Sequence, residues 1–564
     1  GRVAAMLHMG KVMFLTLRSN NETLQVVLRA GDGALDTAAI KATKDEVCVG
    51  DVIAAHGCPG RTKLGELSLF GDERPRIVAP YVSTDLVTCP DMRGFATLQE
   101  SELKYRYRFL DMLSSEKTVD CFVTRHKVLM SLRSFLTREG FVEVETPTFH
   151  SIPGGAAATP FATRHHATDS DLYLRVAPEL YLKQLVVGGM ERVFEVGRVF
   201  RNEDADYNHN PEFTSCEFYQ AYATYEDLMG TTEHLLRGIA EEATGSTVVQ
   251  VRRPDGSMAP VDFGPPFKRV RVMPTLEERL NVKFPPLPEL DTREGVAFLV
   301  QIFNERGLQL PSVLTAAKLV DKLIDRFITD DVIEPTFVTD HPVFMSPLAK
   351  AHPDGSHTSE RFELFINGME ICNAYSELTD PVEQYRRFEQ QMRQREMGDC
   401  ESQAIDDTFL KALQVGLPPT AGWGMGVDRL CMLLSGSASI RDVIAFPLMR
   451  PDSARDARRR ARSASFFGFD HHMTSFVLKS LEAELERRGE LRCCNQLRAL
   501  RQTLEATLRS HDVHGGGSGA GSGARAGGPM PFPCAAGGSM DFGSMFGSPV
   551  LKLLMAMLCP PPMR

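Results

Sequence analysis

The chain has 564 residues, of which 63 are Lys or Arg and 73 are Asp or Glu, so its formal net charge is −10. At about 150 residues per domain, this length predicts three to four folding units and excludes a small module held together by disulfides. The hydrophobic fraction of 43% excludes a compositionally disordered protein. The mildly acidic balance excludes a strongly basic nucleic-acid coat.

The cysteines point to a reducing compartment. There are 12 of them, without a Cys-x-x-Cys pair, and only Cys493 and Cys494 are adjacent. This pattern favours free thiols inside the cell and gives no sign of a zinc site. No apolar run reaches the roughly 20 residues that span a bilayer, so we expect no membrane association. The chain begins without Met inside an expected strand, so we expect a missing N-terminus, and cytoplasm and mitochondrion both fit.

Two kinds of pattern precede residue 451. Short alternating apolar runs at 11–28 and 47–69, punctuated by turn residues, predict a small β-barrel over 1–80, followed by a linker over 81–103. Helical periodicity then ends at Gly140 and gives way to an alternating strand over 141–145. Strands and helices mix without a regular βαβ repeat as far as 451. We therefore predict an α+β domain on an antiparallel sheet over 104–451.

The composition changes after residue 451. A basic run at 455–462 precedes two amphipathic segments, which predict a helical extension over 452–512. This hairpin could pack on the main domain or bind a partner. Gly515 to Gly547 contains 12 of the 45 glycines, which is typical of a flexible tail over 513–564 that ends in an apolar decapeptide at 550–559.

One segment groups an arginine, acids, an imidazole and an aromatic ring on two strand-like stretches, 192–200 and 213–223, joined by a polar turn. The residues are Arg201, Glu203, His209, Phe213 and Glu217. A lone Arg-x-Glu is usually a surface ion pair that contributes little. This larger grouping predicts a β-hairpin that lines a site for a polyanionic, aromatic ligand such as a nucleotide.

A second group is acidic: Glu363, Glu370, Asn373 and Glu377 lie within 361–378, where β-branched and aromatic residues favour strands. Clustered carboxylates repel one another unless cations join them. The group is therefore either a solvated acidic face or a site for Mg²⁺ or a substrate ammonium. The glycine-rich run 422–426, taken alone, is typical of a tight turn or of close helix packing.

In order and spacing, these stretches resemble the class II lysyl-tRNA synthetases over about residues 1–451. The family's motifs 1, 2 and 3 are similar to 140–147 (GFVEVETP), 194–203 (FEVGRVFRNE) continuing to Tyr219, and 422–429 (GWGMGVDR). Its lysine-specific stretches are similar to 152–156 (IPGGA), 177–181 (APELY) and 370–377 (EICNAYSE). The resemblance implies an N-terminal OB-fold barrel and a class II catalytic domain, with a homodimer interface at motif 1.

The resemblance also implies a reaction, in which ATP activates L-lysine to lysyl-adenylate and the lysyl group passes to the 3′ end of tRNA(Lys). Arg201 and Arg429 would be the catalytic pair. Residues implied for ATP are Arg201, Glu203, His209, Phe213, Glu363, Glu370 and Arg429, with Glu363 and Glu370 holding Mg²⁺. Residues implied for lysine are Gly155, Glu179, Arg201, Glu217, Tyr219, Asn373 and Glu377.

For the anticodon, the implied residues are Phe14, Gln25 and Glu66 in the barrel. Basic residues that the family often carries before this aromatic are replaced by the Met6-Leu7 region, so we expect anticodon binding that is weaker or differently arranged. The alternatives are an aspartyl- or asparaginyl-type synthetase, a ligase that lysinylates a protein, and a non-catalytic scaffold. The extension after 451 lies outside the resemblance, and our hypothesis is that it regulates the enzyme.

Overall fold

The structure is a computed structural model that describes residues 1–81 and 101–449, apart from 21, 34, 254, 397–400 and 402. Most of the expected linker, the expected helical extension and the glycine-rich tail lie outside the described residues, so these predictions stay predictions. Within the described part, no helix is both long enough and apolar enough to cross a membrane.

The N-terminal part is a seven-stranded sheet with the order β5-β6-β3-β2-β1-β4-β7. Its strands are β1 (Arg2–Met9), β2 (Val12–Ser19), β3 (Glu22–Arg29), β4 (Val52–Ala54), β5 (Gly57–Arg61), β6 (Leu67–Gly71) and β7 (Arg76–Ala79). All neighbours pair antiparallel except β3 and β6. Helix α1 (Thr37–Glu46) begins where the Asp36 side chain accepts the Ala39 N–H, and it buries Ile40 in the core. This sheet is consistent with the expected OB-fold.

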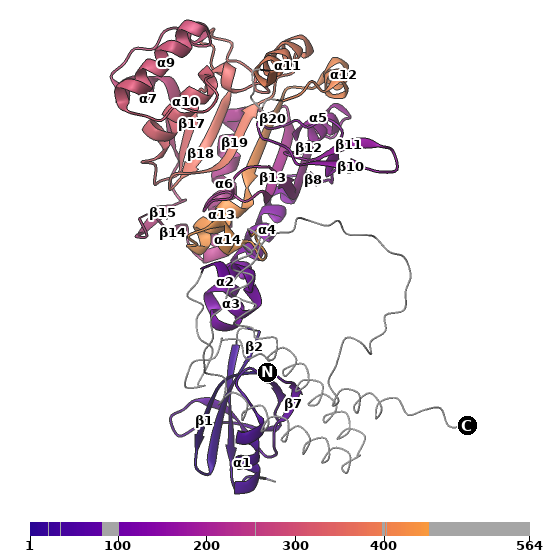
Figure 1. The fold of residues 1–564 in the computed structure, drawn as a ribbon, viewed down its shortest axis with the longest axis vertical. Helices are drawn as coiled ribbons and strands as arrows, with labels where there is room; N and C mark the ends of the chain where they lie inside the picture. Colours follow the sequence, from indigo (N-terminus) through magenta and orange to yellow (C-terminus); the bar gives the residue numbers. More distant parts are fainter. Residues whose placement is uncertain are drawn as a thin grey trace, which may run out of the picture. The chain divides into compact units, whose positions relative to one another are not determined.

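The second part is built on an eight-stranded sheet with the order β16-β17-β18-β19-β20-β13-β12-β8 (Figure 1). The strands are β8 (Val142–Glu143), β12 (Arg192–Phe200), β13 (Glu212–Ala221), β16 (Lys268–Arg271), β17 (Thr336–Thr339), β18 (Arg361–Ile366), β19 (Met369–Ser376) and β20 (Thr420–Gly426). The central strands are antiparallel, and only the edge pairs β16–β17 and β12–β8 are parallel. The α+β prediction is therefore confirmed. The strand expected over 141–145 is only two residues long.

Three helices cover one face of this sheet: α4 (Glu116–Arg138), α6 (Tyr225–Thr244) and α13 (Val427–Ser435). Their apolar residues form one core with the inward side chains of β13 and β20. Trp423 is 1% exposed and stacks on Phe218 with ring centroids 4.9 Å apart, and its indole N–H donates to Thr232 at 3.0 Å. Because side chains alternate along a strand, the neighbours of these residues point to the opposite face. That opposite face carries the site.

Shorter elements complete the second part. The small sheets comprise β9 (Phe149–His150), β10 (Ala162–His165) and β11 (Ser170–Leu174), and β14 (Val248–Arg252) with β15 (Met258–Asp262). The helices are α2 (Ser101–Arg106), α3 (Arg108–Ser114), α5 (Glu179–Val187), α7 (Val272–Leu280), α8 (Leu287–Leu290), α9 (Arg293–Arg306), α10 (Ala316–Ile324), α11 (Pro381–Glu396), α12 (Asp407–Gly416) and α14 (Ile440–Val443), with a π-helical turn, η1 (Asp325–Thr329), and a 3₁₀ turn, η2 (Val343–Met345). Helices α7, α9 and α10 form a second core of their own beside β17 and β18.

The glycine-rich run 422–426 is a strand and not a tight turn, so the interpretation from the run alone is wrong. It forms β20, which leads directly into α13. A Cβ on Gly422 would lie 2.2 Å from Oε1 of Glu377 and 2.4 Å from Cε1 of Tyr219. Glycine is required here because the side chains of Glu377 and Tyr219 approach the backbone.

Candidate active site

A cavity of about 440 Å³ opens on the face of the sheet opposite the three covering helices. The residues implied for ATP and lysine line it, with one exception. They come from β13, β18, β19, the starts of α5 and α13, the loop 201–211 between β12 and β13, and the segment around Gly155. The exception is Glu377, which lies directly behind Gly422. The fold thus brings together residues more than 200 positions apart in the chain.

One end of the cavity is strongly acidic. Glu179, Glu217 and Glu377 are all buried, with exposures of 4%, 9% and 1%. Tyr219 donates its hydroxyl to Oε2 of Glu217 at 3.2 Å. The Tyr375 hydroxyl lies 2.7 and 2.8 Å from the two Glu179 oxygens. Both tyrosines thus orient carboxylates toward the cavity.

Lys183 supplies an internal cation to this end. Its side chain has no exposure, its Nζ donates to Oε1 of Glu179 at 2.6 Å, and it forms an ion pair with Glu377. Burial works against its charge, but Glu179 and Glu377 outweigh burial and raise the pKa of Lys183 above its usual value. The ammonium therefore stays charged between the two carboxylates.

The remaining carboxylate charge is only partly compensated. Burial raises the pKa of Glu217 to about 8, Glu179 adds to the rise, and Arg201 opposes it. Burial also raises the pKa of Glu377, although Lys183 opposes this rise. Oε1 of Glu377 is buried without a hydrogen-bond partner among the described residues. Another ammonium at this end would stabilise the ionised carboxylates.

Sequence reasoning missed Lys183 and Tyr375. Lys183 follows Glu179 by four residues on α5, a spacing that places both side chains on one helix face. This spacing was a usable signal for the pair. The burial of Lys183 against Glu377, which directly follows β19, was not visible in the spacing.

The other end of the cavity carries cations. The Arg201 guanidinium lies 5.3 Å from the centroid of the Phe213 ring, and its Nε is buried without a partner among the described residues. Arg429 donates to the backbone oxygen of Glu370 at 2.9 Å and contacts its carboxylate at 3.3 Å. Nη2 of Arg429 also lies 2.9 Å from Nε2 of His209. These groups are placed to meet phosphates.

The loop 201–211 carries its own internal support. Asp206 accepts the backbone N–H groups of Asn208 and His209, each at 2.7 Å. Its carboxylate also lies 2.9 Å from Nδ1 of His209. The imidazole is therefore held between Asp206 on the loop and Arg429 on α13. The hairpin predicted around these residues is present as β12 and β13.

A β-bulge decides which acidic residues share a face. Glu363 lies opposite Asn373, but Phe365 lies opposite Glu370, so β19 has one extra residue at Ile371. Without the bulge, Glu370 and Asn373 would point to opposite faces. With it, Glu363, Glu370 and Asn373 all line the cavity. Although burial of Glu363 opposes ionisation, Arg361 and His341 lower its pKa to about 2.

The residues implied for the anticodon meet in the barrel. Phe14 and Gln25 share one face of the sheet, because Phe14 pairs with Val27 and Gln25 with Thr16. Gln25 donates to Oε2 of Glu66 at 3.0 Å. Gln25, with its partner Glu66, and the half-buried ring of Phe14 thus lie on the same side of the sheet. Their role in anticodon binding stays a prediction.

Comparison with known proteins adds a decisive observation. A family model described as class II tRNA synthetases (D, K and N) matches residues 100–450. The chain belongs to this family. Its match covers the whole second part of the fold, including the cavity and the three motif regions. The family description covers D, K and N and does not by itself choose among them.

Individual relatives are similar over most of their length. A protein named lysine–tRNA ligase cla4 from Cladosporium cladosporioides is 43% identical over 457 residues, which are 80% of this chain and 75% of that protein. A probable cytoplasmic lysine–tRNA ligase from Encephalitozoon cuniculi is 42% identical, over 80% of this chain and 87% of its own length. A lysine–tRNA ligase from Thermotoga maritima is 40% identical, over 80% and 85%.

Proposed function

We propose that this chain is a lysine–tRNA ligase that activates L-lysine with ATP and transfers the lysyl group to the 3′ end of tRNA(Lys). The observation that carries the proposal is the buried acidic end of the cavity. A long apolar stem that ends in an ammonium needs a carboxylate at its far end, because an unpaired buried charge is costly. Glu217 and Glu377 meet that need, and the names of the relatives agree with it.

The charges of site and substrate match. When all three carboxylates are ionised, Glu179, Glu217 and Glu377 exceed the two cations Lys183 and Arg201 by one negative charge. Lysine at neutral pH carries two ammonium groups and one carboxylate, so it brings one positive charge. We propose that Glu217, Glu377 and the Tyr219 hydroxyl bind the side-chain ammonium. Gly155 and Glu179 would take the α-ammonium, and Asn373 the carboxylate.

The same charges argue against the neighbouring specificities. An aspartate side chain would place a carboxylate against Glu217 and Glu377, and an asparagine side chain would leave them without a counter-ion. A non-catalytic scaffold would have no use for an Arg201 with an unpaired buried Nε. A ligase that lysinylates a protein is disfavoured by the barrel at 1–81.

The chemical step needs positioning and charge stabilisation and no protein nucleophile. A carboxylate oxygen of lysine bonds to the α-phosphorus of ATP, the bond to the β-phosphate oxygen breaks, and pyrophosphate leaves. Arg201 would hold the lysine carboxylate and the α-phosphate with its planar fork. His209 and Arg429 would neutralise the outer phosphates, Phe213 would stack on adenine, and Glu203 would contact the ATP end.

The carboxylates present fit Mg²⁺ bound together with ATP. This ion usually takes one or two protein carboxylates, with phosphates and waters completing its shell. Glu363 is ionised, with a pKa of about 2, and Glu370 shares its face of the sheet. Among the described residues, no group of three or more potential ligands forms a cage without substrate. The ion would neutralise phosphate charge when bound, held by Glu363 and Glu370.

Assembly and location are part of the proposal. Exposed apolar side chains on and next to motif 1 support a homodimer: Val123 is 48% exposed, Met130 52% and Val142 51%. Phe14, Gln25 and Glu66 would contact the tRNA anticodon. We propose the cytoplasm or the mitochondrion as the compartment. The name of the Encephalitozoon relative, which includes the word cytoplasmic, supports the cytoplasm.

Lysine-dependent ATP–pyrophosphate exchange tests the function. We expect exchange with lysine and none with aspartate or asparagine, followed by charging of tRNA(Lys). Glu377→Gln should raise the KM for lysine at least about 100-fold, because it removes one partner of a buried charge pair, and the KM for ATP should stay within about twofold. Glu360→Gln, a buried acid outside the cavity, is the matched control. Exchange that requires aspartate, or no exchange at all, would overturn the proposal.

A further inference from the structure

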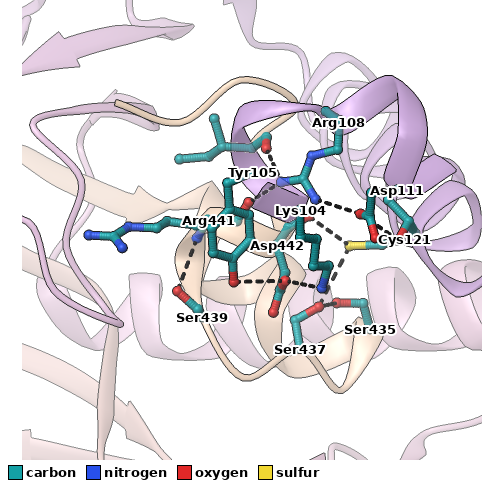
Figure 2. Close-up of polar contacts among 12 residues, drawn as sticks. Lys104, Tyr105, Arg108, Asp111, Cys121, Ser435, Ser437, Ser439, Arg441 and Asp442 are labelled. Atoms are coloured by element: carbon teal, nitrogen blue, oxygen red, sulfur yellow. Dashed lines mark hydrogen bonds and ion pairs between the residues drawn. The ribbon is translucent and has the colours of Figure 1, made fainter. Parts of the chain in front are cut away.

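A polar cluster outside the cavity joins the start of the second part to the segment that follows motif 3. Helices α2 and α3 contribute Lys104, Tyr105 and Arg108, and the other side is the segment 435–445, which contains α14 (Figure 2). The cluster binds neither proposed substrate directly. Its contacts nevertheless lead to the loop 201–211.

Arg108 closes the end of α14. Its side chain is 1% exposed, and it donates to the backbone oxygens of Arg441 at 2.5 Å, Ile444 at 3.1 Å and Ala445 at 3.1 Å. The fourth contact is to Oδ2 of Asp111 at 3.1 Å. A planar guanidinium can make these bonds at once, whereas an ammonium has no such fork.

Lys104 and Tyr105 bind the same short helix, α14, through the side chain of Asp442. Both donate to Oδ1 of Asp442, at 2.8 and 3.1 Å. Burial, with Asp442, raises the pKa of Tyr105 to about 12, so its hydroxyl remains a donor at neutral pH. Cys121 of α4 adds a weak contact to the backbone oxygen of Asp442 at 3.7 Å.

The helix held in this way contacts the ATP-binding loop. The N–H of Ile440 donates to the backbone oxygen of Tyr207 at 2.7 Å, and Arg441 reaches the backbone oxygen of Ala205 at 3.4 Å. Ile440 itself lines the cavity. Two residues after Tyr207, His209 meets Arg429. The chain of contacts therefore runs from α2 and α3 through α14 to the residues that would bind the outer phosphates.

We propose that Lys104, Tyr105 and Arg108 are positioning residues that hold the loop 201–211 in its ATP-binding arrangement through α14. This inference rests on the proposed ATP-dependent function. The acidic, lysine-binding end depends on α5, β13 and β19, and among the described residues no hydrogen bond joins Lys104, Tyr105, Arg108 or Asp442 to these elements. Loosening the cluster should therefore weaken ATP use selectively.

The first test separates the two substrates. Lys104→Met and Tyr105→Phe remove single contacts to Asp442 and leave Arg108 in place. Each should raise the KM for ATP about three- to tenfold, while the KM for lysine changes less than about twofold. Lys283→Met is the matched control, because it removes an exposed lysine–carboxylate pair, with Glu277, away from the cavity. Equal changes in both KM values, or none, would overturn the proposal.

A double-mutant cycle tests the path. Lys104→Met in an Asp442→Asn background should add little to the KM for ATP, because both changes break the same contact. Arg108→Lys should have a larger effect than either, and Arg237→Lys, which also alters an arginine bound to backbone oxygens, is its control. Fully additive effects of the first pair would contradict coupling through Asp442.

A readout without turnover keeps the two proposals apart. Hydrogen exchange followed by mass spectrometry should show faster exchange of peptides covering 203–211 and 437–445 in Lys104→Met, with peptides of β13 and β19 unchanged. If the wild-type protein shows no lysine-dependent ATP–pyrophosphate exchange, the proposed function fails, but hydrogen exchange still decides the positioning role. Unchanged hydrogen exchange at 203–211 in Lys104→Met would refute the positioning role.

Discussion

Replacing Lys183 by Met should destabilise the protein in a pH-dependent manner. The methionine keeps an apolar side chain of similar length at this position, where Nζ of Lys183 lies 5.8 Å from the ring centroid of Tyr375 and 5.5 Å from that of Phe409. It removes the ammonium that lies 2.6 Å from Glu179 and also pairs with Glu377. Two buried carboxylates, Glu179 and Glu377, would then lack their internal cation.

The magnitude follows from the burial. Removing one partner of a fully buried ion pair leaves an uncompensated charge and costs about 3–5 kcal/mol. The carboxylates can limit this cost by binding protons, since their pKa values rise further in the variant. When a carboxyl group has a higher pKa in the folded than in the unfolded protein, the protein loses stability as the pH rises from the unfolded-state value toward the folded-state value. The loss should therefore be small near pH 6 and large near pH 8.5.

Thermal unfolding and lysine kinetics check this reasoning. At pH 8.5 the unfolding midpoint of Lys183→Met should fall by about 5–10 °C, with a smaller fall at pH 6. The KM for lysine should rise at least about tenfold, because Glu377 loses its orienting partner. Lys127→Met is the control, because it removes an ammonium that donates to the backbone oxygen of Ala243 at 3.4 Å and forms no ion pair among the described residues.

A Lys183→Met variant as stable as wild type at pH 8.5 would refute the argument. A loss of equal size at pH 6 and pH 8.5 would also refute it, because packing defects do not depend on carboxylate ionisation. The double variant Lys183→Met, Glu377→Gln should recover part of the stability, since it removes one of the unpaired charges.

Three further predictions follow from the site and its core. Because the pKa of Glu217 is about 8, lysine binding at pH 7 should release a proton, and binding should tighten as the pH rises from 6 to 8. Calorimetry in buffers of different ionisation heat measures both effects, and proton uptake on binding would contradict this prediction. Gly422→Ala should lower kcat/KM for lysine at least about 100-fold in the exchange assay, since its Cβ would lie 2.2 Å from a Glu377 oxygen, and unchanged kinetics would show that the close approach is not required. Thr232→Val should cost about 1–3 kcal/mol in urea unfolding by leaving the indole N–H of Trp423 buried and unpaired, whereas a loss below about 0.5 kcal/mol would count against that hydrogen bond.

Local patterns were sufficient for the hairpin at the ATP end. Alternating apolar residues predicted strands on both sides of 201–211, and β12 and β13 are found there. The charged and aromatic residues of this segment lie next to one another in the chain, so a single local element brings them together. The function of the acidic group at 363–377 was harder to predict. A solvated acidic face and a cation site differ in whether the carboxylates point to solvent or into a cavity, and the local pattern does not show this.

The amino-acid sequence by itself determined the α+β class, the hairpin and the family resemblance, and the residues implied for ATP and lysine line the cavity, except Glu377. Tertiary structure decided three things that spacing could not. The bulge at Ile371 places Glu370 beside Glu363, the helix α5 brings Lys183 against Glu377, and the close approach of Tyr219 explains Gly422. Alternation and helical periodicity describe one element at a time. A register shift, a buried ion pair between distant elements and a gap too small for a Cβ arise only when elements pack against each other.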